Sequence, residues 1–245
     1  MKFAVLFVLL TGWAGSGIAA DSLHSDFDRI LSANVSNDQV NYPGIAADPL
    51  FEGYLEKLNA ISADDLSEDK EKLAYWINAY NAFAIQGILQ GYSPSSLFGR
   101  FGFFLSKKFN LGGAEIDLYD LEHKILIPQK EPRIHFAINC ASVSCPTLRS
   151  EAYVAADLDR QLEDSARRFI NDPSRNRFDR ENKVAYLSRI FDWFEDDFSR
   201  RSGSVLAYVA RYVDNAELAG ELNNRDYTIE YLEYDWNLNG ISPES

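Results

Sequence analysis

The stretch LAYWINAYNAFAI, residues 73–85, is apolar on nearly every side when it is drawn as a helix. A helix that is hydrophobic all round lies inside a fold rather than on its surface. The surrounding pattern extends this helix from about Glu68 to Gln90, and Gly91 is a typical residue to follow a helix C-terminus. We therefore expect a buried central helix at about 68–90, with the rest of the chain packed around it.

Helical and extended patterns alternate along the rest of the chain. The spacing of apolar residues predicts helices at 22–35, 49–61, 118–127, 157–171, 190–198 and 205–213. Hairpins are predicted at 108–117 and 177–187, single strands at 133–139 and 227–234, and loops at 41–44 and 92–104. Together these elements predict an α+β fold, with helices packed around a small, mostly antiparallel sheet.

Charge and length restrict the class of protein. The 245 residues include 37 Asp and Glu against 24 Lys and Arg, which gives a formal net charge of −13. Such a chain repels a phosphate backbone, so we expect no nucleic-acid partner. The sequence contains no low-complexity tract and no linker rich in Pro or Gly, and its length is typical of one domain.

The first twenty residues have the pattern of a secretory signal peptide. The charged start Met1-Lys2 precedes an apolar core at 3–10 and a run of mostly small residues that ends at Ala20. The apolar core is too short to span a bilayer, and no later stretch is long and apolar enough to do so. We therefore expect residues 1–20 to be a signal peptide, residues 21–245 to form a single globular domain, and the protein to be periplasmic or secreted.

The segment HFAINCASVSCP, residues 135–146, contains both cysteines of the chain, Cys140 and Cys145. A disulfide between them would close a short loop and stabilise the fold by only about 2 kcal/mol, so it would shape a local turn or act in redox exchange. A nucleophilic thiol, a metal site with His135 and inert core cysteines are the other hypotheses. Because the spacing matches no zinc pattern and a strand would direct His135 and Cys140 to opposite faces, we expect no metal and no cofactor.

A nucleophilic cysteine needs a base and a group that orients the base. His123 and His135 are the candidate bases, and an asparagine of the central helix could orient the ring, as in a Cys-His-Asn triad. The alternative for these asparagines is structural, because a buried amide has to be hydrogen-bonded. The candidate catalytic residues are therefore Cys140, Cys145, His123, His135, Asn78 and Asn81.

Residues near these candidates are expected to contact the substrate. Backbone N–H groups in the turn from Ala141 to Ser144 could stabilise an oxyanion. Glu122 points about 100° away from His123 on a helix, so it is a poor direct orienter of that histidine. The candidate substrate-binding residues are Glu122, Trp76, Tyr80, Asn139 and Ser144.

Several of these segments resemble the bacterial family called domain of unknown function 547. The resemblance runs from about Asn41 to Asn239 and implies one whole domain of a kind that is typically exported in bacteria. It directs attention to His123 and to the segment from Cys140 to Cys145, and it implies no established mechanism. The similar stretches are LAYWINAYNA (73–82), DLEHKIL (120–126), RIHFAINCASVSCP (133–146), LSRIFDWF (187–194) and YLEYDWNLN (231–239).

Functions from different classes fit these observations. The first is a cysteine-dependent hydrolase or transferase that acts on amide, ester or thiol-peptide substrates, with a small molecule or peptide as ligand. The second is a non-enzymatic envelope binding or scaffold module, with a Cys140–Cys145 disulfide and a protein partner at the aromatic loop Phe98–Phe109. Thiol–disulfide exchange lies between these classes and requires a labile bridge.

Overall fold

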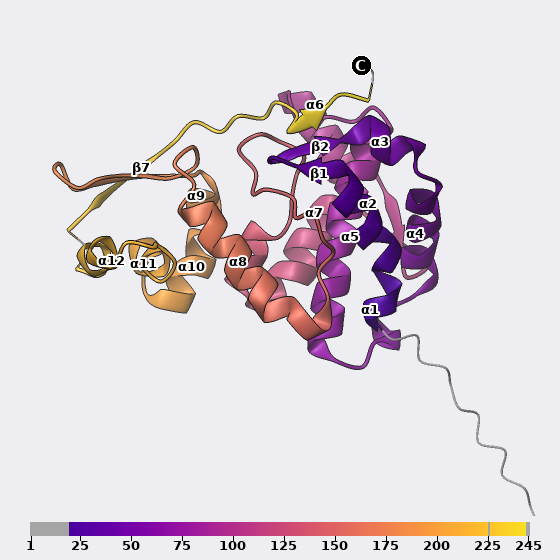
Figure 1. Ribbon diagram of the computed structural model, residues 1–245, viewed down its shortest axis with the longest axis horizontal. Helices are drawn as coiled ribbons and strands as arrows, with labels where there is room; N and C mark the ends of the chain where they lie inside the picture. The colour runs from indigo at the N-terminus through magenta and orange to yellow at the C-terminus, as the bar shows by residue number, and fades with distance from the viewer. Residues whose placement is uncertain (1–19, 225, 244–245) are drawn as a thin grey trace, which may run out of the picture.

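The computed structural model describes residues 20–224 and 226–243 (Figure 1). The predicted signal peptide lies outside the described residues, apart from its last position, Ala20. Within the part of the chain that the structure describes, no helix is long and apolar enough to cross a membrane.

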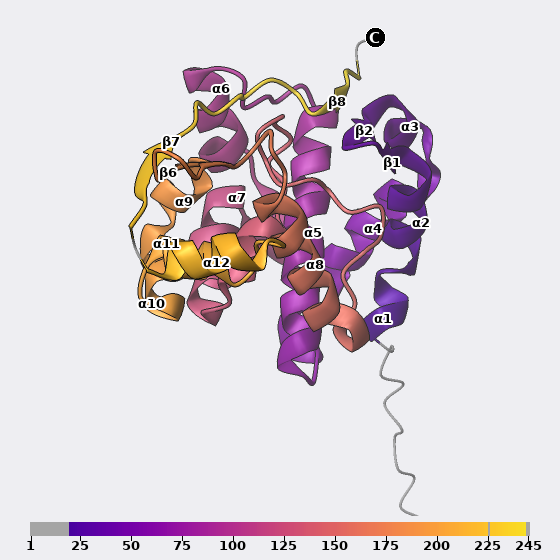
Figure 2. The same ribbon diagram turned by 60° about the vertical axis from the view of Figure 1, so that its left-hand side comes forward.

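The central helix is α5, Asp69–Leu89, which confirms the prediction of a buried helix at about 68–90. Glu68 and Glu71 form a capping box at its N-terminus. Every residue from 77 to 85 is buried, including two asparagines. Figure 2 shows α5 running between helices from the N-terminal and the C-terminal parts of the chain, which explains why its sequence is apolar all round.

The N-terminal helices pack against one side of α5 and share one hydrophobic core with it. The loop predicted at 41–44 is wrong, because the Asn41 side chain accepts a hydrogen bond from the N–H of Gly44 and caps a helix there. The helices of this part are α1, Ala20–Leu23, α2, Ser25–Asn34, α3, Tyr42–Ala47, and α4, Pro49–Ala60.

The C-terminal helices enclose a second core, in which Phe191 and Phe198 are fully buried. Figure 1 shows the last of these helices, at 195–223, on the side of the molecule opposite α1–α4. The helices are α8, Leu158–Ile170, α9, Ile190–Trp193, α10, Glu195–Ser202, α11, Val205–Ala210, and α12, Ala216–Asn223. The last of them was not predicted.

Short helical segments connect the two parts. Helix α6, Leu97–Phe101, continues into a π-helical segment, Gly102–Ser106, within the predicted loop. Helix α7, Leu118–Asp120, continues through a π-helical segment, Leu121–Leu126, and a 3₁₀ helix, Ile127–Gln129, so the predicted helix at 118–127 is confirmed. Further 3₁₀ turns lie at Ala63–Asp65 and Ala155–Asp157.

The strands form small, mostly antiparallel sheets, as predicted for an α+β fold, but within residues 20–224 and 226–243 they are divided among three sheets. Both predicted hairpins are present, as β3–β4 and β5–β6. Two pairings, β2–β8 and β6–β7, are parallel. The strands are β1, Val35–Ser36, β2, Gln39–Asn41, β3, Phe109–Leu111, β4, Ala114–Ile116, β5, Arg177–Asp179, β6, Val184–Leu187, β7, Thr228–Tyr231, and β8, Gly240–Ile241.

The strand predicted at 133–139 is wrong, since the chain forms a 3₁₀ helix at Pro132–Phe136. Proline is well suited to the start of a helix because it has no N–H to satisfy, and Glu131 caps the turn by accepting a hydrogen bond from the N–H of Arg133. The helical turn places Ile134 in the first core and Phe136 in the second. The cysteine segment that follows therefore lies where the two cores meet.

Candidate functional site

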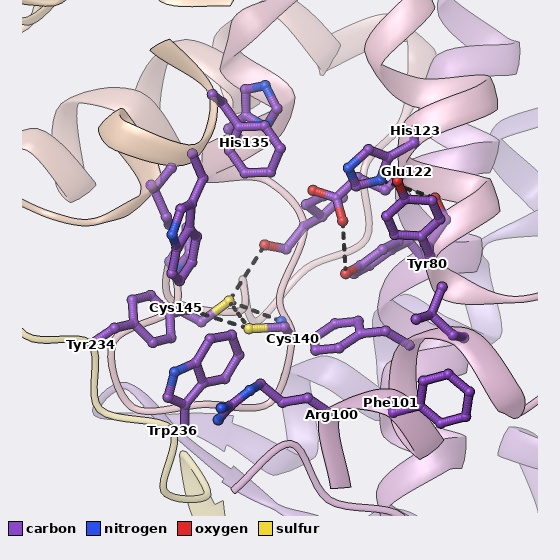
Figure 3. Close-up of a pocket in the computed structure, with 18 of the residues that line it drawn as sticks. Tyr80, Arg100, Phe101, Glu122, His123, His135, Cys140, Cys145, Tyr234 and Trp236 are labelled. Atoms are coloured by element: carbon purple, nitrogen blue, oxygen red, sulfur yellow. Dashed lines mark hydrogen bonds between the residues drawn. The ribbon is translucent and has the colours of Figure 1, made fainter. Parts of the chain in front are cut away.

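A single cavity collects most of the residues to which the sequence directs attention. Its volume is about 430 Å³, within the range of small-molecule sites. Figure 3 shows the two cysteine sulfurs together in its wall, with Tyr80 and Glu122 on one side and Tyr234 and Trp236 on another. The lining residues come from α5, α6 with the π-helical segment after it, α7 and its continuation, the cysteine segment, α9 and the C-terminal segment: Tyr80, Leu97, Arg100, Phe101, Phe104, Leu105, Tyr119, Glu122, His123, His135, Ile138, Cys140, Cys145, Pro146, Ile190, Trp193, Phe194, Tyr234 and Trp236.

The two cysteines are free thiols in direct contact. Their Sγ atoms lie 2.9 Å apart, and the N–H of Cys140 donates a hydrogen bond to Cys145 Sγ, also over 2.9 Å. Both residues are buried, yet both line the cavity. No bond joins the two sulfurs in the structure, and no group of three or more His, Cys, Asp or Glu within the described ranges is arranged to hold a metal ion.

The environment separates the acidities of the two thiols. Burial alone would raise the pKa of Cys140, but hydrogen bonds with Cys145, Ser142 and Tyr234 outweigh it and lower the pKa to about 7. The hydroxyls of Ser142 and Tyr234 lie 3.1 Å and 3.4 Å from Cys140 Sγ. Burial and the neighbouring Cys140 raise the pKa of Cys145 instead. At neutral pH the pair can thus hold a thiolate at Cys140 beside a thiol at Cys145.

Asn81 and Asn139 hold the cysteine segment in place. The Asn81 side chain donates to the carbonyl of Ala137 over 3.0 Å and accepts from the N–H of Asn139 over 2.8 Å. The Asn139 side chain in turn donates to the carbonyl of Pro146 and accepts from the N–H of Ala141. These bonds support Ala141 at a φ of 63°, a backbone conformation that is strained for a residue with a Cβ.

The backbone of the cysteine turn is already hydrogen-bonded elsewhere. The N–H of Ala141 donates to Asn139, and those of Val143 and Ser144 donate to carbonyls of the C-terminal segment. These three groups are therefore not free to bind an oxyanion. The N–H of Ser142 faces the Cys140 sulfur instead, where its hydrogen bond helps to lower the pKa of the thiol, so the prediction for the turn from Ala141 to Ser144 fails for three of its four N–H groups.

Glu122 is a partly buried carboxyl group in the same cavity as the thiols. Burial and the charge of Cys140 raise its pKa to about 8, although a hydrogen bond from the Tyr80 hydroxyl, 3.5 Å away, opposes this. Glu122 is therefore mainly a neutral carboxylic acid at pH 7. Such a group can give a proton to, or take one from, a reacting sulfur nearby.

Both candidate histidines line the cavity, but neither is paired with a thiol. His123 Nδ1 lies 3.1 Å from the carbonyl oxygen of Tyr119, and His135 Nε2 lies 2.9 Å from Asp197 Oδ2. Burial lowers the pKa of each imidazole. No hydrogen bond joins either sulfur to a histidine among the residues that the structure describes, so the structure does not assemble the predicted Cys-His pair.

The remaining candidates lie outside the cavity lining. Asn78 makes two hydrogen bonds with the backbone of Tyr153, which is the structural alternative for this residue. Asn81 likewise bonds only to backbone, so neither asparagine orients a histidine. Ser144 accepts a hydrogen bond from the N–H of Asp235, and Trp76 is partly buried against the first core.

Sequence reasoning missed the residues that the C-terminal segment supplies. Tyr234 contacts Cys140, and Trp236 packs against Tyr234 with ring centroids 4.5 Å apart. Arg100 lies over the Trp236 ring at 4.7 Å. The stretch at 231–239 is one of those that resemble the family, and its aromatic residues are the signal in the sequence that points to a place in the site.

The fold and the cavity define a class: an α+β protein with a buried pair of free thiols in an aromatic pocket. Residues 63–170 match the family described as Protein of unknown function, DUF547, so the chain resembles that family over α5, the connecting segments, the cysteine segment and α8. Neither a comparison with curated proteins nor one with solved structures gave a match.

Replacing Tyr234 with Phe should make Cys140 a weaker acid, because one hydrogen bond to the thiolate is lost. We expect the pKa of Cys140 to rise by roughly one pH unit and its alkylation by iodoacetamide at pH 6.5 to slow about fivefold, with the two rates converging above pH 9. Mass spectrometry of alkylated peptides measures the alkylation rate of Cys140 in the variant and in the unaltered chain. Tyr231→Phe is the matched control, and equal pH profiles for Tyr234→Phe and the unaltered chain would contradict the assignment.

Proposed function

We propose that the chain carries out thiol–disulfide exchange, with Cys140 as the attacking thiolate and Cys145 as the second thiol. The observation that carries this proposal is the contact of two free sulfurs, 2.9 Å apart in the wall of one cavity. The opposite pKa shifts of the two thiols support it, because a thiol with a pKa near the ambient pH attacks disulfides most effectively.

The reaction takes place in two balanced steps. The Cys140 thiolate attacks one sulfur of a substrate disulfide, so that a mixed disulfide forms and the other substrate sulfur leaves as a thiolate that takes up a proton. Cys145 then loses its proton and attacks Cys140 Sγ, which releases the second substrate thiolate and leaves a Cys140–Cys145 disulfide. The substrate gains two electrons, and the protein dithiol loses two. The reverse sequence oxidises a dithiol substrate.

Glu122 supplies the proton transfer that this reaction needs. Cys145 has a raised pKa and requires a base in the second step, whereas the first leaving thiolate requires an acid. With a pKa of about 8, Glu122 can act in either direction near neutral pH. The hydroxyl of Tyr80, a residue of α5, donates a hydrogen bond to the Glu122 carboxyl group, and both side chains line the cavity.

The cavity favours disulfides with apolar surroundings, such as small molecules or peptides with apolar side chains beside the cysteine. Its wall is mostly aromatic and aliphatic. Export to a periplasmic or extracellular space, which rests on residues 1–20 alone, is part of the proposal because disulfides persist in such compartments.

A cysteine-dependent hydrolase or transferase is the second candidate. It is favoured by the neutral Glu122 carboxyl, which could protonate a leaving group next to an acyl-Cys140. Two observations weigh against it: within the described residues no histidine is hydrogen-bonded to either thiol, and the N–H groups of Ala141, Val143 and Ser144 already have acceptors. An acyl transfer has no need of the second sulfur, so Cys145 distinguishes the two candidates.

A redox titration tests the proposal. The purified chain is equilibrated with glutathione buffers of stepped potential, trapped with acid, and alkylated before mass spectrometry. We expect one reversible two-electron transition that joins Cys140 to Cys145, with a midpoint of roughly −120 to −270 mV. A pair that stays reduced at every potential would refute exchange and leave acyl transfer, which a lasting thioester at Cys140 would reveal.

A further inference from the structure

Helix α6 and the π-helical segment after it present apolar side chains to solvent. The exposed fractions are 71% for Leu97, 89% for Phe98, 62% for Phe101 and 40% for Leu105. Leu97, Phe101 and Leu105 are spaced four residues apart, so they form one stripe along the helical surface. A stripe of this kind normally packs on a core. Here it is Phe103 that packs inward, against Gly87 of α5.

The same segment carries basic charge in an otherwise acidic protein. The sequence from Lys72 to Ala114 contains no Asp or Glu, although the whole chain has a formal net charge of −13. Lys108 pairs with Asp117. Arg100 lies over the ring of Trp236, and the Lys107 amine lies 5.3 Å from the ring of Phe109; no ion pair with an acidic group is found for either within the described part of the chain.

We infer that residues 97–107 dock onto a phospholipid bilayer that contains anionic headgroups. Exposed Leu and Phe side chains beside Arg and Lys are the pattern of a segment that lies in a membrane interface. The local basic charge complements the anionic headgroups, while the acidic remainder of the protein is repelled by them. Figure 2 shows α6 at the periphery of the molecule, where a flat surface can reach it.

Docking in this way would place the mouth of the thiol cavity against the lipid. Leu97, Phe101 and Leu105 belong both to the exposed stripe and to the lining of the cavity. An apolar ligand could therefore pass from the bilayer into the cavity without crossing water. The docking itself rests on the surface alone and does not depend on the proposed thiol chemistry.

Sedimentation with vesicles tests the docking. The protein is purified as the producing cell processes it, and the mass of each preparation is measured to verify that all variants have the same N-terminus. We expect binding to phosphatidylcholine vesicles with about one third phosphatidylglycerol, roughly tenfold weaker binding to phosphatidylcholine alone, and weakening by high salt. Failure of the unaltered chain to bind the anionic vesicles would overturn the inference. This is also the result expected if the stripe binds a protein partner instead of a membrane.

Matched variants locate the contact. Phe98 does not line the cavity, and Phe98→Asp should reduce binding to anionic vesicles roughly tenfold, whereas Ile241→Asp, an exposed apolar residue of β8, should not. Lys107→Glu should weaken binding and Arg29→Glu, on α2, should not. If Phe98→Asp does not fold, as judged by circular dichroism, Phe98→Ser replaces it. Binding of the folded Phe98 variant at unaltered strength would refute the docking. The Cys140→Ser variant should bind vesicles as strongly as the unaltered chain, whatever the redox titration shows, because the docking does not depend on the thiols.

Discussion

Replacing Cys140 with Ser should abolish disulfide exchange, whereas replacing Cys145 with Ser should stop the reaction half-way. A serine hydroxyl does not ionise near neutral pH, so Cys140→Ser removes the attacking group. Cys145 cannot take over, because burial, the largest cause of its raised pKa, remains when Cys140 is replaced. We expect the rate of reaction with oxidised glutathione at pH 7 to fall roughly a thousandfold or more.

The Cys145→Ser variant separates exchange from acyl transfer. Cys140 can still form a mixed disulfide with glutathione, but no second sulfur is present to release it. Intact mass spectrometry should therefore show one glutathione adduct at Cys140 in this variant and only transient adduct in the unaltered chain. Val143→Ala, at an exposed side chain of the same turn, keeps both sulfurs and the side-chain hydrogen bonds of Cys140 and is the matched control. Full turnover by Cys145→Ser on a disulfide substrate would rule out the two-sulfur mechanism.

The elements that the sequence predicts correctly are those that local patterns determine. Helix α5 is apolar over a long stretch and has clear ends, and the hairpins β3–β4 and β5–β6 flank recognisable turns. The segment at 133–139 fails because its residues favour a strand by composition. The segment forms a 3₁₀ helix instead, because this conformation places Ile134 in the first core and Phe136 in the second and brings His135 to Asp197.

The site is predictable where its residues lie close together in the sequence. Cys140 and Cys145 form the contact that their spacing allowed, and Glu122 and His123 share a cavity with them. Tyr234 lies 94 residues from Cys140 along the chain, and no local pattern signals that contact. It arises because the C-terminal segment returns across the cysteine turn through a bridge between Ser142 and Leu238.

The sequence predicts histidine bases from residue type alone, but in the structure both ring nitrogens with a partner are bonded away from the sulfurs. His135 is turned toward α10 by its bond to Asp197, and His123 stacks on Tyr119 with ring centroids 3.9 Å apart. The acidity of Cys140 comes instead from hydroxyl and thiol neighbours. Hydrogen bonds of this kind are made by common residues, so a sequence does not mark them.

Two asparagines of α5 allow the support of the thiols to be separated from the support of the fold. Asn78 binds the backbone of Tyr153, and Asn81 binds the backbone on both sides of Ile138, directly before the cysteines. Replacing either with Leu leaves one buried N–H and one buried carbonyl without partners. We expect each variant to lower the free energy of unfolding by about 3 kcal/mol in urea denaturation.

Only Asn81→Leu should also change the chemistry of Cys140. Without the Asn81 amide, the N–H of Asn139 loses its acceptor and the turn that holds Cys140 beside Cys145 relaxes. The thiolate then loses part of its hydrogen bonding, so the pKa of Cys140 should rise toward the ordinary value of a thiol, and alkylation at pH 6.5 should slow. Asn78→Leu, equally destabilised, should keep the alkylation profile of the unaltered chain. Of the two asparagines, Asn81 contacts the backbone next to the cysteine turn and Asn78 does not. If both variants slowed alkylation equally, the acidity of Cys140 would therefore depend on the overall stability of the fold and not on the Asn81 contact.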